Sequence, residues 1–212
     1  MSDTAYNTIA AYSTGEYTEK KSRFIADAYP ARTPDEAASY LAMTQKKYPD
    51  ARHHCYAYVL GTRSETSKMS DNGEPSGTAG KPILEVIHGA GLTDIIIIVT
   101  RYFGGTLLGT GGLVRAYTKA AQEAISHATV TRMVYGKTMT IAFSYDLVNT
   151  IQYYLDKNGI AFSNPVYASD VSYDITVPSG DTERITQGLI EKTDGNIVIL
   201  EGDTGWHATD TA

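Results

Sequence analysis

The second half of the chain shows the clearest pattern of apolar and polar positions. Apolar side chains recur twice at the spacing of one helix face, at Leu147, Val148, Ile151 and Leu155, and then at Ile185, Leu189 and Ile190. With the extended stretches around them, the predicted order is strand, helix, strand, strand, helix and strand, at about residues 137–143, 144–159, 160–167, 171–177, 181–195 and 197–201. This βαββαβ order predicts a ferredoxin-like domain.

The first 130 residues contain more glycine and charge, and they predict a separate domain of strands and helices. Strands are expected near 8–18, 24–29 and 52–60, and the apolar run at 95–99 is typical of a buried strand. Helices are expected between the Thr33 cap and Pro49, around Ile83 and Ile87, and from the glycine-rich turn to about residue 127. We place a linker at 128–136. The expected protein is therefore α+β, with domains at 1–130 and 137–206.

Composition and charge narrow the class of protein. Of the 212 residues 42% are hydrophobic and 20% are charged, as in ordinary globular proteins. The net charge of −6 disfavours indiscriminate coating of nucleic acid, but it allows a local basic patch. Cys55 is the single cysteine, which excludes an internal disulfide. Neither a signal-peptide pattern nor an apolar run of about 20 residues is present, so we expect a cytoplasmic protein without a membrane partner.

Residues 100–117, TRYFGGTLLGTGGLVRAY, place five glycines directly after the buried strand. A glycine-rich turn that opens a helix presents free backbone N–H groups at the positive end of the helix dipole, which suits an anion. No GxGxxG or P-loop pattern occurs, so no standard dinucleotide or nucleoside triphosphate site is predicted. The alternative is a tight strand–helix crossing in which glycine serves packing alone. Under the first interpretation, phosphate contacts come from Arg101, Gly104, Gly105, Gly109, Thr110, Gly111, Gly112 and Arg115, with Lys81, Lys21 and Arg23 extending the surface.

The stretch SDNGEPSGTAGKP, residues 70–82, also places glycines before a helix and adds two carboxylates, Asp71 and Glu74. Carboxylates three residues apart can hold a divalent ion or act as acid and base, and they can equally cap a turn or a helix. The letters DNG resemble the start of a calcium loop, but the later ligands of that pattern are absent. Capping is the favoured interpretation, and we predict no metal and no cofactor.

His53, His54 and Cys55 are consecutive, so on a strand His53 and Cys55 share one face and His54 faces the other. A catalytic cysteine needs a base within hydrogen-bond reach and preferably a third group that orients the base. The sequence shows no such arrangement. We therefore predict a buried thiol beside a half-exposed imidazole, and no catalytic residue.

Four of these motifs make the chain resemble the YigZ/IMPACT family. They are KKSRFIA at 20–26, DARHHCYAY at 50–58, SDNGEPSGTAGKP at 70–82 and VTRYFGGTLLGTGGLVRAY at 99–117. The family usually has aspartate where this chain has Asn72, which weakens any role that needs adjacent carboxylates. The resemblance implies an N-terminal domain similar to the second domain of ribosomal protein S5. It also implies a C-terminal ferredoxin-like domain similar to the last domains of elongation factor G.

The resemblance also suggests a function. Both implied folds recur in translation proteins that touch RNA, and eukaryotic relatives regulate translation by competing for an activator of a stress kinase. We therefore expect a non-enzymatic, translation-linked regulator that binds RNA, a ribosome-associated partner or another translation protein through the glycine-rich, arginine-flanked surface. Two alternatives stay open. One is an enzyme on a phosphorylated or nucleotide substrate with Asp71 or Glu74 as base or metal ligand, and the other is a protein-interaction adaptor whose glycine motifs are purely structural.

Overall fold

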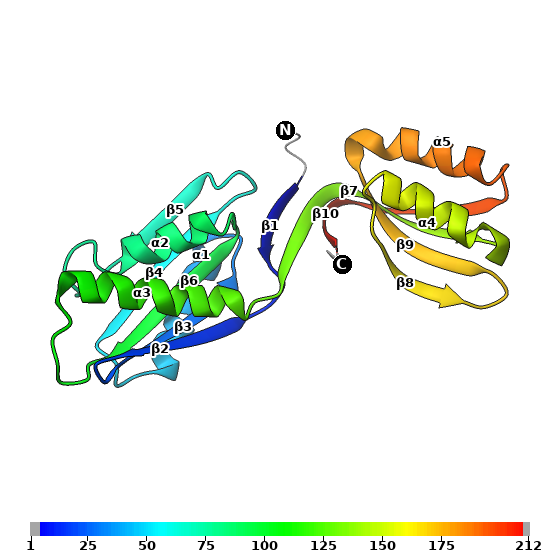
Figure 1. The fold of residues 1–212 in the computed structure, drawn as a ribbon. Helices are drawn as coiled ribbons and strands as arrows, with labels where there is room; N and C mark the ends of the chain where they lie inside the picture. Colours follow the sequence, from blue (N-terminus) through cyan, green and yellow to red (C-terminus); the bar gives the residue numbers. More distant parts are fainter. Residues whose placement is uncertain (1–4, 210–212) are drawn as a thin grey trace. The chain divides into compact units, whose positions relative to one another are not determined.

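A computed structural model describes residues 5–209, and Figure 1 shows their fold. The described chain divides into two units that meet in the sequence at about residue 130. Each unit combines one β-sheet with helices, so the α+β class expected from the sequence is observed. Within the described residues, no helix is long and apolar enough to span a lipid bilayer.

The first unit is built on an antiparallel sheet of five strands in the order β2-β3-β6-β4-β5. These strands are β2 (Ser13–Glu19), β3 (Ser22–Pro30), β4 (His53–Leu60), β5 (Thr66–Ser70) and β6 (Ile95–Tyr102). The single strand expected near 8–18 is two strands, because a bend at residues 10–12 separates β1 (Ala5–Ile9) from β2. The sequence did not predict β5, whose residues are mostly exposed.

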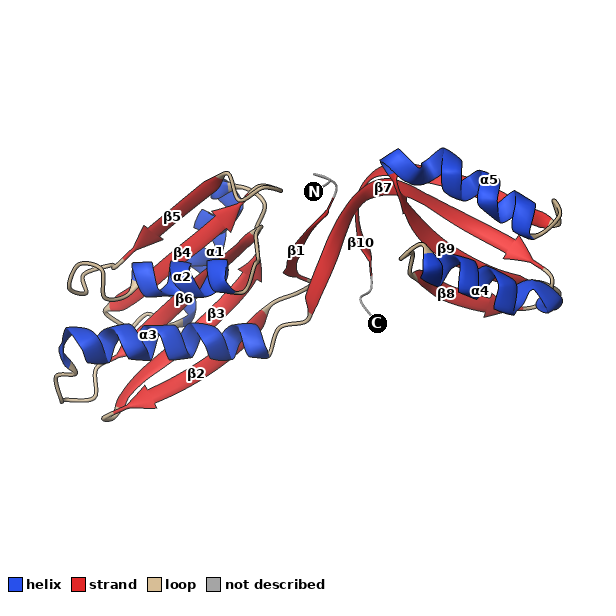
Figure 2. Ribbon diagram, turned by 45° about the horizontal axis from the view of Figure 1, so that its top comes forward, coloured by secondary structure: helices blue, strands red, loops and turns tan. Residues whose placement is uncertain are grey.

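Helices cover both faces of this sheet. Figure 2 shows α2 (Gly80–Gly89) and α3 (Gly109–Ser126) in front of the sheet and α1 (Pro34–Lys47) behind it. The central strand β6 is buried on both sides, because alternate residues of a strand face opposite ways. Ile95, Ile97 and Val99 pack into the core under α2 and α3, and Ile96 and Ile98 pack on the α1 side.

The second unit has the expected succession of elements: β7 (Val130–Phe143), α4 (Val148–Lys157), β8 (Phe162–Tyr167), β9 (Val171–Pro178), α5 (Thr182–Lys192) and β10 (Ile197–Thr209). Short 3-10 turns, Tyr145–Leu147 and Ser179–Asp181, precede the two helices. Its sheet has five strands, in which β10 pairs with β7, β7 with β9, and β9 with β8, and β1 also pairs with β7. The pairings β10-β7, β7-β9 and β9-β8 are antiparallel. One core contains Ile151 and Leu155 of α4 and Ile185 and Leu189 of α5, so both helices cover the same face of this sheet.

The expected linker at 128–136 is mostly strand. β7 begins at Val130, and its first residues pair with the end of β10, from Arg132 opposite Thr209 to Lys137 opposite Thr204. The last strand was expected to stop near residue 201, but after an irregularity between Glu201 and Thr204 it continues to Thr209. Interstrand hydrogen bonds over this stretch therefore make it regular structure, although its sequence has no strong apolar pattern.

Candidate functional site

The start of α2 is closed by a carboxylate from its own chain. One carboxylate oxygen of Asp71 accepts hydrogen bonds from the backbone N–H groups of Ala79 at 2.9 Å and Gly80 at 2.8 Å, and the other accepts from Gly77 at 2.8 Å. Burial favours the neutral acid, but these three hydrogen bonds outweigh it and hold the pKa of Asp71 below its ordinary value. The α2 start therefore has its anion already, and Asp71 acts as a cap.

Close packing keeps this turn in place. A β-carbon at Gly80 would lie only 2.8 Å from the backbone nitrogen of Ser70, at the end of β5. The Thr78 hydroxyl donates to the Pro75 carbonyl oxygen at 2.6 Å. Glycine is thus required where α2 begins, because the helix lies directly against the preceding strand.

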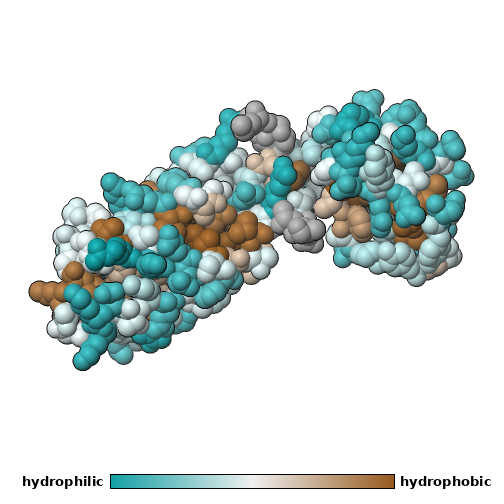
Figure 3. Space-filling view, viewed as in Figure 1, coloured by the Kyte–Doolittle hydropathy of each residue, from teal (hydrophilic) through white to brown (hydrophobic). Residues whose placement is uncertain are grey.

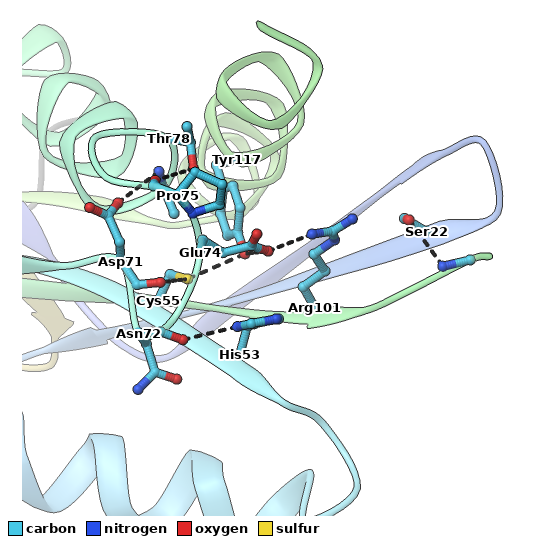
Figure 4. A network of polar contacts seen from close by, with 12 residues as sticks. Ser22, His53, Cys55, Asp71, Asn72, Glu74, Pro75, Thr78, Arg101 and Tyr117 are labelled. Atoms are coloured by element: carbon cyan, nitrogen blue, oxygen red, sulfur yellow. Dashed lines mark hydrogen bonds and ion pairs between the residues drawn. The ribbon is translucent and has the colours of Figure 1, made fainter. Parts of the chain in front are cut away.

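A buried network lies beside the cap and joins three elements (Figure 4). Glu74 Oε1 accepts from Arg101 Nη1 at 2.6 Å and from Tyr117 Oη at 2.9 Å. The Arg101 and Glu74 side chains are only 7% and 4% exposed. Glu74 thus ties the turn after β5 to the end of β6 and to the third turn of α3, in a place where an unpaired charge would be costly.

Two aromatic rings enclose Arg101. Its guanidinium carbon lies 5.4 Å from the ring centre of Phe24 and 5.6 Å from that of Phe103. Its Nε is buried and has no hydrogen-bond partner among residues 5–209. Arg101, which the sequence suggested as a phosphate contact, is therefore turned inward, because the carboxylate of Glu74 and the two rings hold its charge.

Cys55 is enclosed beside the Tyr117 hydroxyl and the Asp71 backbone, and its thiol is protonated at neutral pH. Cys55 Sγ lies 3.2 Å from Tyr117 Oη and 3.0 Å from the carbonyl oxygen of Asp71. Burial raises the pKa of the Cys55 thiol to about 12, and burial also raises the pKa of Tyr117. A thiolate is the reactive form of cysteine, so at neutral pH Cys55 is a packing residue rather than a nucleophile.

The two histidines face opposite sides of β4. His53 Nδ1 lies 2.9 Å from the carbonyl oxygen of Asn72, and His54 Nδ1 lies 3.1 Å from Thr100 Oγ1. Burial lowers the pKa of His54. The Asn72 side chain accepts from the His54 backbone N–H at 2.7 Å. The Asn72 amide therefore holds the start of β4 by this hydrogen bond. A carboxylate beside Asp71 is not needed for this contact.

The start of α3 differs from that of α2. Leu108 occupies the N-cap position, its side chain makes no capping hydrogen bond, and no acidic residue lies in the first turn. Gly109 has a φ of +70°, a conformation that side-chain-bearing residues rarely adopt. Among residues 5–209, no carboxylate accepts from the backbone N–H groups of this helix start in the way that Asp71 does at α2.

The glycine-rich loop before α3 rests on the β2–β3 hairpin. A β-carbon at Gly104 would collide with the backbone of Lys21 and Ser22, and the Gly104 N–H donates to Ser22 Oγ at 3.1 Å. Gly111 has free space around its Cα, because an added β-carbon would meet only Arg115 Nη1, at 3.7 Å. Gly104 therefore serves packing, and Gly111 lies on an accessible surface.

The remaining predicted cations have different surroundings. Arg23 forms a double hydrogen bond to Glu16, at 2.6 and 2.7 Å. Lys81 lies 3.8 Å from Glu85, one turn along the exposed face of α2. Lys21 lies in the exposed hairpin turn, and Arg115 lies exposed on α3. In the part of the chain that the structure describes, neither Lys21 nor Arg115 forms an ion pair.

Two apolar side chains are exposed in the same loop. Phe103 is 59% exposed and Leu107 is 83% exposed. Figure 3 shows hydrophobic surface at the end of the first unit where α3 begins. We call this surface the α3 tip, and it comprises residues 20–21 of the hairpin turn, the loop 103–108, the start of α3 at 109–111, and Arg115. Gly112, which the sequence also suggested as a phosphate contact, is buried.

Sequence reasoning missed two residues that shape this region. Tyr117 is fully buried and completes the Glu74 network, and Phe103 covers Arg101. Tyr117 could have been found as the one polar-tipped residue on an apolar helix face that also contains Leu113, Ala116 and Ala120. Among residues 5–209 there is no group of three or more His, Cys, Asp and Glu side chains placed to hold a metal ion.

Known proteins with similar sequences are related over most of this chain. Residues 20–125 match the model of the Impact N-terminal domain, and residues 141–196 match a domain of unknown function. The IMPACT family member YvyE of Bacillus subtilis is 34% identical over 94% of this chain and 92% of its own. YigZ of Escherichia coli is 33% identical over 85% of this chain and 90% of its own.

A shorter similarity reaches eukaryotic proteins. Protein IMPACT of Bos taurus is 30% identical over 43% of this chain and 30% of its own. A crystal structure of a hypothetical protein superposes with a TM-score of 0.62 at 32% identity, and it covers 94% of this chain and 98% of that one. The motifs, the two matched domains and these relatives together show that the chain belongs to the IMPACT family.

Proposed function

We propose that this protein is a non-enzymatic, translation-linked regulator that binds RNA, free or within a ribonucleoprotein, through the α3 tip. The observation that carries the proposal is the uncapped start of α3, which lies one turn from the exposed Arg115. Helix N–H groups and a nearby guanidinium together form a typical phosphate contact. Lys21 of the β2–β3 turn adds a second cation to the α3 tip, because its backbone lies against Gly104 in the loop before α3.

Phe103 gives the α3 tip a second means of holding RNA. Its ring is 59% exposed and has Arg101 beneath it. An exposed aromatic ring offers a stacking surface to an unpaired base, worth about 1–3 kcal/mol per base. Arg101 therefore supports the ring in this proposal. Phosphate is contacted by Arg115, Lys21 and the backbone of residues 109–111. Arg23 and Lys81 lie beside acidic partners and contribute little.

The geometry gives the enzyme alternative less support. Asp71 is occupied by three backbone N–H groups, and Glu74 by Arg101 and Tyr117. The Cys55 thiol is buried and protonated. A general base or a metal ligand needs a carboxylate oxygen that a substrate can reach. Both oxygens of Asp71 accept from the backbone, and the Glu74 side chain is only 4% exposed and paired with Arg101.

The folds and the cellular setting belong to the same proposal. We infer a ferredoxin-like fold for residues 137–206, because the second sheet has the order β10-β7-β9-β8 with both helices on one face. For residues 1–130 we infer an S5 domain 2-like fold, as the resemblance to the IMPACT family implies. A cytoplasmic regulator would meet RNA in translation. The match to the Impact N-terminal domain, residues 20–125, includes the α3 tip.

The proposal is tested by charge reversal at the tip. The double variant Lys21→Glu/Arg115→Glu and the wild type are purified from cells, and bound RNA is quantified by absorbance and sequencing while bound proteins are identified by mass spectrometry. We expect RNA with the wild type and its loss from the variant. Unchanged RNA content would contradict the proposal. Equal recovery of one protein partner by both forms, without RNA, would favour the adaptor alternative.

A further inference from the structure

The second unit has a groove on its helical side, away from the α3 tip in the sequence. Figures 1 and 2 show α4 and α5 side by side over the sheet. Between them lies a hollow of about 560 Å³. Eight side chains form its walls: Asn149, Thr150, Tyr153, Tyr154, Lys157, Asn158, Arg184 and Lys192. Its volume is within the range of small-molecule sites, roughly 300–1,000 Å³.

A close contact between the two helices lies at the wall of the hollow. A β-carbon at Gly188 of α5 would collide with the ring of Tyr154 on α4. Glycine at this position therefore lets the tyrosine ring lie directly against the backbone of the neighbouring helix. Tyr154 forms part of the wall, whereas Tyr153, the next residue, is 68% exposed and leaves its ring available.

The groove is cationic in a protein whose net charge is −6. Three of its eight lining residues are Lys157, Arg184 and Lys192, and none is acidic. Arg184 forms an ion pair with Asp181 outside the lining, so the two lysines supply the groove's unpaired charge. Within residues 5–209, Lys157 and Lys192 form no ion pair or hydrogen bond, so both charges are available to a ligand.

Arg184 is held in place at one end of the groove. Its Nε and Nη2 donate to Asp181 Oδ1 at 3.1 and 2.9 Å, and its Nη1 donates to Asn158 Oδ1 at 2.7 Å. A guanidinium has five N–H donors, so two remain for a ligand after these three bonds. A positioned guanidinium loses little conformational freedom when it binds an anion.

We propose that this groove binds a nucleotide, either as a free nucleoside monophosphate or as one residue of an RNA strand. Lys157 and the two free N–H groups of Arg184 hold the phosphate by charge-assisted hydrogen bonds, because the Arg184 bond to Asn158 places both cations at the same end of the groove. The exposed ring of Tyr153 stacks on the base, and the amide of Asn149 is suited to the donors and acceptors at a base edge. Asn158 instead positions Arg184 and bonds to the Tyr154 carbonyl oxygen. A flat ring and an amide beside the cations favour a nucleotide over a bare anion.

This site is independent of the α3 tip, because the two share no residue and lie in different units. Charge reversal at Lys21 and Arg115 should therefore leave nucleotide binding in the groove unchanged. Conversely, loss of the groove would leave the RNA contacts of the α3 tip intact. The two proposals can thus fail separately.

The experiment is isothermal titration calorimetry of the full chain with adenosine 5′-monophosphate, adenosine, inorganic phosphate and an oligoadenylate trinucleotide. The variants are Lys157→Ala/Lys192→Ala and Tyr153→Ala, with Lys46→Ala as a control for loss of an exposed lysine outside the groove. Circular dichroism verifies folding. We expect the double variant to weaken binding of the monophosphate at least about tenfold, the equivalent of one charged hydrogen bond. Tyr153→Ala should weaken it by a similar factor, and Lys46→Ala should not.

Each outcome decides the proposal. Binding of the monophosphate well above that of adenosine and of phosphate, with loss in the two groove variants, supports it. Tighter binding of the trinucleotide that is lost in the same groove variants then identifies an RNA strand as the source. Trinucleotide binding in the groove that is equal to or weaker than that of the monophosphate identifies a free nucleotide. No binding of the monophosphate, equal affinities in wild type and groove variants, or phosphate binding as tight as the monophosphate would overturn it.

Discussion

The two helices that cover the same face of the first sheet begin in opposite ways. Both follow a glycine-rich turn, and in the sequence both look like anion sites. At α2 the backbone N–H groups already bind the carboxylate of Asp71, whereas α3 has no capping side chain and no acidic residue in its first turn. A glycine-rich helix start is therefore a candidate ligand site only when the chain supplies no anion of its own.

The comparison also separates structural from functional roles among the charged residues. Arg101 and Glu74 neutralise each other in the interior and connect the α2 turn to α3. Arg115 is exposed beside the open helix start. Removing an interior charge should therefore affect folding, and removing the exposed one should affect binding.

The largest effect is expected from the network that joins the two helix starts. Arg101→Ala leaves Glu74 buried without its cation, which should cost about 3–5 kcal/mol of unfolding free energy. Denaturant titration of the full chain measures this loss. The double variant Arg101→Met/Glu74→Leu is the control, because it removes both charges and should recover most of the stability. An Arg101→Ala protein as stable as the wild type would show that the pair is not an interior contact.

A smaller loss is expected at the α2 cap. Asp71→Ala removes three backbone hydrogen bonds and should cost about 0.5–2 kcal/mol. Arg115→Ala, at the uncapped helix, should change stability by less than about 0.5 kcal/mol. Thermal unfolding of both variants compares the two helix starts directly. Equal losses would contradict the difference between them, and so would a large rise in the wild-type melting temperature with Mg²⁺ or Ca²⁺ that Asp71→Ala abolishes.

The pH dependence of stability sharpens the same contrast. The pKa of Asp71 lies below its ordinary value of 3.8, so between these two values the unfolded chain binds more protons than the folded protein. The contribution of Asp71 should be complete above the ordinary value and should disappear as the pH falls through the folded-state pKa. Urea unfolding of wild type and Asp71→Asn from about pH 6 to about pH 2 measures it. The two curves should converge at low pH, and a constant offset would count against the cap.

Two matched glycine substitutions test how closely each helix start is packed. Gly111→Ala at α3 has open space for its β-carbon and should stabilise the protein by about 0.5–1 kcal/mol. Gly80→Ala at α2 should destabilise it, because its β-carbon would press on the backbone of Ser70. Denaturant titration of both variants suffices. Effects of the same sign would contradict the proposed difference in packing.

Much of the fold could be predicted from local patterns. The helices of the second unit follow from apolar spacing, and Thr33 caps α1 as expected, its Oγ1 accepting from the Glu36 backbone N–H at 3.2 Å. Pairing between distant segments was harder to predict. Residues 130–136 become strand through β10, more than sixty residues away, and β5 forms on β4 with mostly exposed side chains. Such contacts depend on the tertiary structure, which outweighs local propensity.

The site was predictable in location more than in role. Asp71 lies at the start of α2, and Glu74 contacts Arg101 and Tyr117 of the glycine-rich segment. Spacing could not show that Arg101 turns toward Glu74, because the register of β6 with β3 and β4 decides which face it occupies. It also could not distinguish the two helix starts, since the carboxylate that fills one of them comes from a residue nine positions earlier.

The central claim is that the α3 start, and not the α2 start, contacts phosphate. The most direct measurement is the affinity for a single-stranded RNA at several salt concentrations for wild type, Arg115→Ala and Lys81→Ala, which each remove one exposed cation near a helix start. Arg115→Ala should weaken binding and reduce the slope of log affinity against log salt by about 0.7, the value for one phosphate contact. Lys81→Ala should change neither. An Arg115→Ala protein with wild-type affinity and slope, or equal losses in both variants, would contradict the account.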